Sequence, residues 1–201
     1  MSLPCHLVIM AKAPRMGRVK TRLAKDIGTV GAWSFYRHTL GHVARPLNRD
    51  LRWRTWLCVS PDGSVADNKI WPVDAQRFKQ GDGDLGMRMG RAMEALPPGP
   101  VVLIGADIPD IAPHHIAQAF RLLGSHDVVF GPATDGGYWL VGQRRRPRFL
   151  SLFSKVRWSS PHALADTLKN LPNSARTGFL EELSDVDDGP SYSEFETKQP
   201  T

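Results

Sequence analysis

The chain has 201 residues, of which 41% are hydrophobic and 23% charged. This balance is ordinary for a globular protein and excludes a disordered chain, and the length fits one domain with a sizeable core. No apolar run approaches the roughly 18 residues that a membrane-spanning helix needs, and the N-terminus lacks the pattern of a signal peptide. We therefore expect a cytoplasmic protein without membrane contact, whose two cysteines, Cys5 and Cys58, are free thiols.

The net charge of +6 indicates an anionic partner. The positive charge is concentrated near the N-terminus, where six basic residues precede the first acid, Asp26: Lys12, Arg15, Arg18, Lys20, Arg22 and Lys25. A nucleic-acid-binding face would carry basic residues along several elements, whereas one dense basic loop fits a small polyphosphate. We expect a nucleotide-like ligand rather than a nucleic acid, with binding of an RNA backbone as the alternative.

Strand and helix patterns alternate along the chain. Apolar or alternating runs predict strands at residues 7–10, 54–59, 77–80, 101–104, 127–130 and 138–141. Helical spacing predicts helices at residues 29–44, 84–96, 113–123 and 161–171, the first preceded by a less regular turn from Leu23 and ended by Pro46. The tail beyond Asp188 is predicted to be polar and loosely packed.

This alternation predicts an α/β fold with a mostly parallel sheet that helices cover on both faces. A hairpin or an antiparallel edge strand around residues 138–153 would make the sheet mixed. The chain shows no internal repeat, low-complexity segment or clear linker. We therefore expect a single domain over residues 1–201.

The most informative strand is the apolar run at residues 101–104, which is typical of a strand buried on both faces. Gly105 follows and allows a turn, and Pro109 ends the strand because it cannot continue a ladder of hydrogen bonds. Asp107 is thereby placed at the carboxyl edge of a central strand, where open α/β sheets bind ligands and a carboxylate can hold magnesium on a phosphate. The alternative is that Asp107 only caps the helix beginning after Pro113.

The loop at residues 11–23 follows the first strand and leads into the first helix, so its amides and cations can meet an anion. Lysine supplies a point charge, and arginine supplies two parallel donors for phosphate oxygens. The loop is not a P-loop, because Val19 stands where that motif needs the glycine before Lys-Thr. We interpret it as a phosphate-binding loop; the alternative is a solvated basic loop.

Residues 81–86 match the pattern G-x-G-x-x-G, with Asp107 about 20 residues further on, which is the spacing of a dinucleotide site. Two acids in this loop, Asp82 and Asp84, would repel a pyrophosphate. The preceding residues 77–80 are too polar for a buried first strand, and the basic loop would stay unexplained. We therefore regard the dinucleotide site as the weaker hypothesis.

Other polar groups are open to two interpretations each. Asp135 precedes two glycines that allow either a plain turn or a close backbone approach to a ligand. The acids at residues 185–188 form either a solvated face or, if one of them folds back towards Asp107, part of a shared magnesium site. His114 and His115 at a helix start are expected to be structural.

Taken together, the motifs resemble the GT-A-fold, nucleotide-diphospho-sugar-transferase-like family known as radical-SAM/selenodomain-associated transferase 1, or arsenosugar-biosynthesis-type glycosyltransferase. The first matching piece is the K-x-P-x-x-G-x-x-K-T-R-L loop at residues 12–23. The others occur in the family's order at residues 84–89, 104–109, 131–138, 158–159 and 185–187. A more distant similarity is to the guanylyltransferases of molybdenum-cofactor and phospholactate metabolism.

The resemblance implies a three-layer α/β/α GT-A fold, with a nucleotide-binding half at about residues 1–110, an acceptor half at about 111–188 and a polar tail at 189–201. It implies Asp107 and Asp187 as ligands of magnesium or manganese. It implies a nucleotide- and phosphate-binding set of Lys12, Arg15, Gly17, Lys20, Arg22, Gly86 and Arg88. The chain departs from the family at Ala106 and Ile108, where the family usually has Ser or Thr and then Cys, and at Met87, where it usually has Glu.

The sequence therefore predicts a magnesium-dependent transferase that uses a nucleotide-activated donor and a small acceptor. Lys20 and Asp107 are the expected catalytic groups, together with Asp135, which would orient or deprotonate the acceptor. Glycosyl transfer from a nucleotide sugar is the first hypothesis. The alternatives are nucleotidyl transfer with release of pyrophosphate and, in another class, a non-catalytic nucleotide- or RNA-binding protein.

Overall fold

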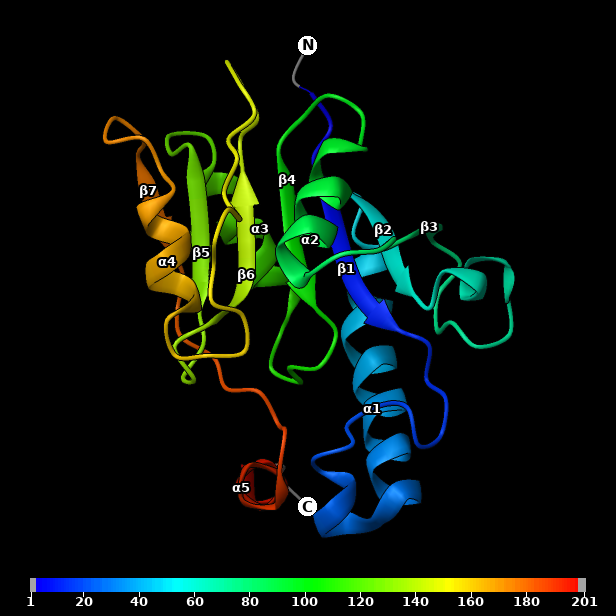
Figure 1. The fold of residues 1–201 in the computed structure, drawn as a ribbon. Helices are drawn as coiled ribbons and strands as arrows, with labels where there is room; N and C mark the ends of the chain where they lie inside the picture. Colours follow the sequence, from blue (N-terminus) through cyan, green and yellow to red (C-terminus); the bar gives the residue numbers. More distant parts are fainter. Residues whose placement is uncertain (1–2, 199–201) are drawn as a thin grey trace.

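The computed structural model describes residues 3–198 and contains a seven-stranded sheet flanked by helices (Figure 1). The strands are β1 (His6–Lys12), β2 (Arg54–Ser60), β3 (Gln76–Lys79), β4 (Val101–Gly105), β5 (Val128–Pro132), β6 (Tyr138–Gln143) and β7 (Thr177–Phe179). The helices are α1 (Ala24–Arg49), α2 (Leu85–Glu94), α3 (Pro113–Leu122), α4 (Ala163–Lys169) and α5 (Gly189–Lys198), with a 3-10 helix, η1, at Asp62–Ala66.

The strand order is β3-β2-β1-β4-β6-β5-β7. β1 lies in the middle of the parallel part and pairs with β2 on one side and β4 on the other. β6 runs antiparallel to both of its neighbours, β4 and β5, whereas β7 is again parallel to β5. The predicted α/β fold with a mostly parallel, mixed sheet is therefore confirmed. The antiparallel strand expected around residues 138–153 is β6, but it lies inside the sheet and not at the predicted edge.

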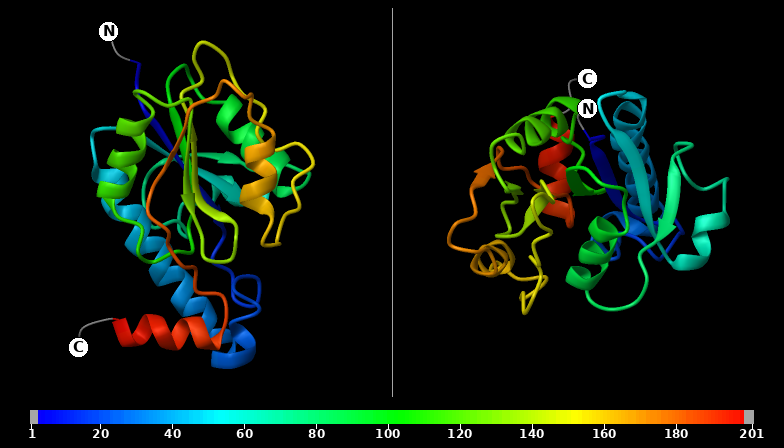
Figure 2. Two further views of the ribbon diagram at one scale, coloured as in Figure 1. Left: turned by 90° about the vertical axis from the view of Figure 1, so that its left-hand side faces the viewer. Right: turned by 90° about the horizontal axis from the view of Figure 1, so that it is seen from above.

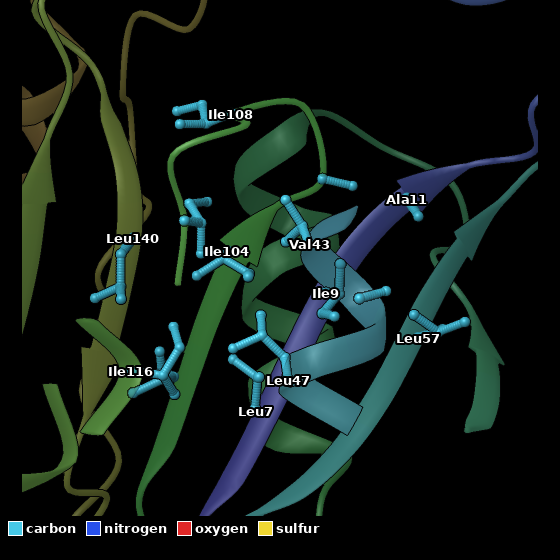
Figure 3. Close-up of a cluster of buried hydrophobic side chains, with 14 of the residues drawn as sticks. Leu7, Ile9, Ala11, Val43, Leu47, Leu57, Ile104, Ile108, Ile116 and Leu140 are labelled. Carbon is cyan, nitrogen blue, oxygen red and sulfur yellow. The ribbon is translucent and has the colours of Figure 1, made fainter. Parts of the chain in front are cut away.

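Helices cover both faces of the sheet, which explains why its central strands are apolar without alternation (Figure 2). On one face, Leu7 and Ile9 of β1 and Ile104 of β4 pack with residues of α1 and α3 (Figure 3). On the other face, Val8 of β1 packs with Met93 of α2. These five side chains are fully buried, so β1 and β4 form a rigid base for the loops at their carboxyl ends.

The first helix agrees with its prediction at the N-terminal end and extends beyond it at the C-terminal end. A first turn precedes Gly28, whose positive φ of 79° interrupts the helical conformation, and the regular part begins at the predicted Thr29. The predicted end at Pro46 is wrong, because α1 continues to Arg49. The φ angle of proline suits a helix, and the last turn is held by Leu47, which is fully buried and accepts hydrogen bonds from Trp53 Nε1 and Thr55 Oγ1.

Two elements near the C-terminus carry no clear sequence signal. β7 is three residues long, too short to show a period. Residues 189–198, predicted as a polar tail, form α5, which lies against the beginning of α1 below the sheet (Figure 1) because the rings of Tyr192 and Phe195 pack edge-on against Phe35. Residues 199–201 of the predicted tail lie outside the described part. No helix among residues 3–198 combines the length and the apolar character needed to cross a membrane.

Candidate active site

A cavity of about 540 Å³ lies at the carboxyl ends of β1 and β4. Its apolar lining includes Met10, Leu103 and Val141, and its charged groups come from four separate regions of the chain. The charged side chains that line it are Lys12, Lys20, Arg22, Arg88, Asp107 and Asp187. The sheet therefore brings four cations and two carboxylates of the predicted set into one concave site.

Aromatic residues of α1 fix the course of the basic loop. The phenol of Tyr36 accepts a hydrogen bond from the backbone N–H of Lys12 and donates one to its carbonyl oxygen, both at 2.9 Å. The indole N–H of Trp33 donates to the carbonyl oxygen of Pro14 at 2.7 Å. These two rings therefore anchor the loop on which the cations stand.

Replacing Tyr36 by phenylalanine is expected to destabilise the protein by about 1–2 kcal/mol, because the backbone N–H of Lys12 would lose its partner beneath the loop. Thermal denaturation should then show a melting temperature lower by roughly 3–6 °C. As a control, Tyr192→Phe removes the same hydroxyl from a partly exposed ring of α5 and should change stability by less than about 0.5 kcal/mol. Equal effects of the two changes would contradict the anchoring role of Tyr36.

The centre of the site is an ion-pair group of Lys20, Asp107 and Asp187. The Lys20 ammonium lies 3.2 Å from Asp107 Oδ2 and 2.6 Å from Asp187 Oδ1, although 87 and 167 sequence positions separate the partners. The guanidinium of Arg22 also donates to Asp187. Of the two interpretations of the acids at residues 185–188, the one in which an acid folds back towards Asp107 agrees with this geometry.

Asp187 reaches the site because the segment 180–188 is held along its length. Leu180 donates its backbone N–H to Phe130, and further on the carbonyl oxygen of Glu181 accepts a hydrogen bond from the indole of Trp139 at 3.1 Å. The backbone N–H of Gly189 donates to Asp26 Oδ2 at 2.8 Å. The segment thus runs from the sheet down to α5, as Figure 1 shows, and delivers Asp187 to the basic loop.

The charges of this group stabilise one another. Burial alone would lower the pKa of Lys20, but the carboxylates of Asp107 and Asp187 outweigh it and raise the pKa above its usual value. Burial also works to raise the pKa of Asp187, but Lys20 and Arg22 outweigh it and hold that pKa below its usual range. At neutral pH Lys20 is therefore an ammonium and Asp187 a carboxylate.

Asp185 is the exception among these acids. Burial, followed by the negative charge of Asp187, raises the pKa of Asp185 from 3.8 to about 6. Between these two pH values the folded protein binds more protons than the unfolded chain, so the contribution of Asp185 to stability falls as pH rises through this window. Above pH 6 the folded protein carries the full cost of this charge.

The Asp185→Asn variant is therefore expected to be more stable than the unchanged protein at pH 8, by about 1 kcal/mol after allowance for solvent screening. Thermal denaturation in EDTA should show a melting temperature higher by roughly 2–4 °C. The difference should become small near pH 4, where the Asp185 side chain of the folded protein is neutral, as that of asparagine is. A stability gain that is the same at pH 4 and pH 8 would contradict this assignment.

The two carboxylates fit a divalent metal. Asp107 and Asp187 both contact the ammonium of Lys20, so their oxygens are close enough together to bind one small cation. Carboxylate oxygens are the ligands that magnesium and manganese prefer. The side chain of Asp107 is 43% exposed and lines the cavity, so its carboxylate is accessible to a ligand there.

Four residues of the predicted set lie outside the lining of this cavity, all within the described part of the chain: Arg15, Gly17, Gly86 and Asp135. Gly86 faces the core, since a Cβ there would lie 2.6 Å from Trp158 and 2.8 Å from Phe153. Asp135 stands in the turn between β5 and β6, where one carboxylate oxygen accepts the N–H of Gly137 at 2.8 Å. The roles of these residues stay predictions.

The G-x-G-x-x-G segment has a structural explanation. It follows the edge strand β3, and Asp84 caps α2 by accepting the N–H of Met87 at 2.8 Å. The guanidinium of Arg91 donates to the carbonyl oxygens of Gln80 and Asp82. Gly81 leaves space for that guanidinium, which a Cβ would approach to 2.4 Å. Arg91 therefore ties this loop to α2.

A second group of metal-ligand types contains His114, His115 and Glu181, whose ligand atoms lie within 4.8 Å of one another. The Nδ1 of His115 accepts the backbone N–H of Ala112 at 3.0 Å, so the ring proton resides on Nε2 and is donated to Glu181 at 2.9 Å. A protonated Nε2 cannot bind a metal. We assign the group, as predicted for the histidines, to structure: it caps α3 and ties down the segment 180–188.

Gln80 is a cavity residue that the sequence gave no reason to select. Its side-chain amide donates to the carbonyl oxygens of Cys58 at 3.0 Å and Ala11 at 3.4 Å. The residue is buried, and it borders the same cavity as Lys20. Only the pairing of β1, β2 and β3 brings these positions together, so local sequence patterns could not indicate it.

The fold and site define a nucleotide-diphospho-sugar-transferase-like α/β protein, and the comparisons agree. Over residues 43–160 the chain matches the family described as "Uncharacterized protein conserved in bacteria (DUF2064)", to which it belongs. A structure from Desulfovibrio desulfuricans G20, given as a proposed nucleotide-diphospho-sugar transferase, is 31% identical, with a TM-score of 0.85 over 94% of this chain and 84% of the other.

Two further similarities are more distant. A 2-phospho-L-lactate guanylyltransferase of Methanocaldococcus sp. (strain FS406-22) is 25% identical over 119 residues, which are 59% of this chain and 51% of the relative. The chain thus spans about half the length of that relative. The manganese complex of Rv0371C from Mycobacterium tuberculosis H37Rv shares the fold, with a TM-score of 0.61, 14% identity and coverage of 98% of this chain and 100% of the other.

Proposed function

We propose that this protein is a magnesium- or manganese-dependent transferase that takes its donor from a nucleotide-diphospho-sugar. The observation that carries the proposal is the convergence of Lys20, Asp107 and Asp187 in one cavity at the carboxyl ends of β1 and β4. A diphosphate needs both cationic donors and a metal held by carboxylates, and this cavity offers both. The similarity to the Desulfovibrio protein supports the sugar nucleotide as donor.

In this proposal Lys12, Lys20, Arg22 and Arg88 neutralise the diphosphate. When the bond between the sugar C1 and the diphosphate oxygen breaks, negative charge grows on that oxygen, and fixed cations beside it lower the barrier. Asp107 and Asp187 would hold the metal, which adds positive charge at the same oxygens. Asp135 would orient or deprotonate the acceptor hydroxyl.

In this proposal, nucleotide binding and acceptor binding belong to two successive parts of the chain. Residues up to about 110 would bind the nucleotide, because β1, β2 and β3 and the basic loop belong to them. Residues from about 111 to 188 would bind the acceptor, except for Asp187, which returns to the nucleotide side through the segment 180–188. The acceptor is proposed to be a small molecule.

Nucleotidyl transfer is the second candidate, and the similarity to a guanylyltransferase favours it. That reaction would break the bond between the α-phosphorus and the bridging oxygen of a nucleoside triphosphate and release pyrophosphate. The same cations and carboxylates serve both reactions. The two candidates differ in the bond that breaks and hence in the product that leaves, a nucleoside diphosphate or pyrophosphate.

A panel of nucleoside triphosphates and nucleotide sugars, each with and without magnesium, tests the proposal by thermal shift, because a bound ligand raises the melting temperature by mass action. The expected result is stabilisation by one nucleotide sugar that depends on magnesium, with release of the nucleoside diphosphate once an acceptor is supplied. Release of pyrophosphate from a triphosphate would favour the second candidate. An affinity that is the same for every nucleotide and falls steeply with salt concentration would indicate an RNA-binding protein instead.

A further inference from the structure

Lys20 occupies an unusual position for a phosphate-binding lysine. Its side chain is 5% exposed, and its ammonium lies within hydrogen-bonding distance of both Asp107 and Asp187. Its backbone has a φ of 45°, in the left-handed region that non-glycine residues rarely adopt. A strained backbone persists only where the surrounding contacts hold it, and the pair of carboxylates provides those contacts here.

The same two carboxylates are the metal ligands of the proposed function. An ammonium and a divalent cation that share these oxygens repel each other, because both are positive and both draw on the same lone pairs. We propose that Lys20 competes with the metal for Asp107 and Asp187, so that metal binding displaces its ammonium towards the cavity, where it can meet the donor phosphates. This inference rests on the proposed function, since it assumes that the carboxylates bind a metal.

The neighbours of Lys20 make this exchange possible without dismantling the site. Asp187 keeps its second partner, Arg22, when the lysine leaves. The segment 180–188 stays attached through the bond from Trp139 to Glu181. Lys20 itself borders the cavity of about 540 Å³, so its flexible side chain can turn from the carboxylates to a ligand there. Metal loading and exposure of the phosphate-binding lysine would thus be a single event.

The test measures binding of manganese alone, with the loss of the free-ion EPR signal as readout. Lys20→Met removes the competitor and is expected to bind Mn²⁺ about tenfold more tightly than the unchanged protein, a coupling of ordinary size between two ligands of one site. Lys12→Met is the matched control: it removes one charge from the same cavity wall, and among the described residues Lys12 forms no ion pair. Its effect should be about threefold or less.

A second measurement uses the unchanged protein and does not depend on a variant that folds. Pulse labelling of amines by reductive methylation, read by mass spectrometry, reports how accessible each lysine is. Lys20 should be poorly labelled without metal and labelled several times faster in saturating Mg²⁺. Lys12 and Lys25, which are exposed or partly exposed in the same region, should change little.

The outcomes separate the two proposals. Tighter Mn²⁺ binding by Lys20→Met, together with metal-dependent labelling of Lys20, supports the exchange. Two results would contradict the exchange and leave the proposed function unaffected. The first is that the unchanged protein binds Mn²⁺ but Lys20→Met binds it no more tightly than Lys12→Met does. The second is that the labelling rate of Lys20 is the same with and without Mg²⁺. If the unchanged protein binds no Mn²⁺ with or without nucleotide, the metal assignment fails and the exchange fails with it.

Discussion

Replacing Asp107 by asparagine is expected to lower turnover by about a hundredfold to a thousandfold while the fold survives. The amide has the shape of the carboxylate but no charge, so it cannot hold the metal at the leaving diphosphate, and the loss of one such stabilising group costs about two to three powers of ten. Stability should change little, because the Asp107 side chain is 43% exposed and Lys20 keeps its shorter bond to Asp187. Steady-state kinetics and magnesium-dependent thermal shifts with the donor found in the panel provide the measurement.

Asp110→Asn is the matched control for this change. Asp110 lies three positions further along the same loop, is exposed, and does not line the cavity among the described residues. The control should keep normal turnover and a normal magnesium response. If Asp107→Asn turned over donor at the same rate as this control, Asp107 would not be a metal ligand, whatever its contact with Lys20.

The sequence predicted the parts of the site that depend on local order. The run at residues 101–104 is buried on both faces as β4, and Asp107 follows it at the carboxyl edge, as the sequence of strand, glycine, acid and proline indicated. Lys20 stands in the loop after β1 for the same reason. A short apolar strand and the residue that ends it are neighbours in the chain, so local patterns suffice to place them.

Long-range contacts could not be predicted in this way. Asp187 contacts Lys20 although 167 sequence positions separate them. Its position depends on β7, which has only three residues, and on single hydrogen bonds such as the one that Trp139 donates to Glu181. The charge run around Asp187 is equally compatible with a solvated face. Only the family resemblance indicated Asp187 as a residue of the site, because secondary-structure propensity and hydrophobic periodicity carry no information about this contact.

The two glycines after Asp135 show the same limit. The sequence allowed either a plain turn or a close approach to a ligand, and the structure shows a close approach to the protein's own backbone. Gly136 has a φ of 82°, and a Cβ there would lie 2.3 Å from the carbonyl oxygen of Pro161. Its own carbonyl oxygen accepts the N–H of Leu164 in α4 at 3.1 Å. The glycine therefore joins the hairpin of β5 and β6 to the start of α4.

Gly136→Ala is accordingly expected to destabilise the protein by about 3 kcal/mol and to lower its melting temperature by roughly 10 °C. The left-handed φ costs an alanine about 1–2 kcal/mol, and the clash adds about 1–3 kcal/mol because a backbone oxygen cannot rotate away as a side chain can. Relief of the clash would require the turn and α4 to separate, which would break the hydrogen bond to Leu164. Chemical and thermal denaturation measure the loss.

Gly137→Ala is the control that distinguishes this explanation from a general need for glycine in the turn. The nearest atom to a Cβ at Gly137 is Oδ1 of Asp135 at 3.0 Å, which belongs to a movable side chain, and the φ of Gly137 is not positive. This change should therefore cost less than about 1 kcal/mol. If both alanines destabilised the protein equally, the flexibility of the turn, and not the contact with Pro161, would be the reason for the glycine pair.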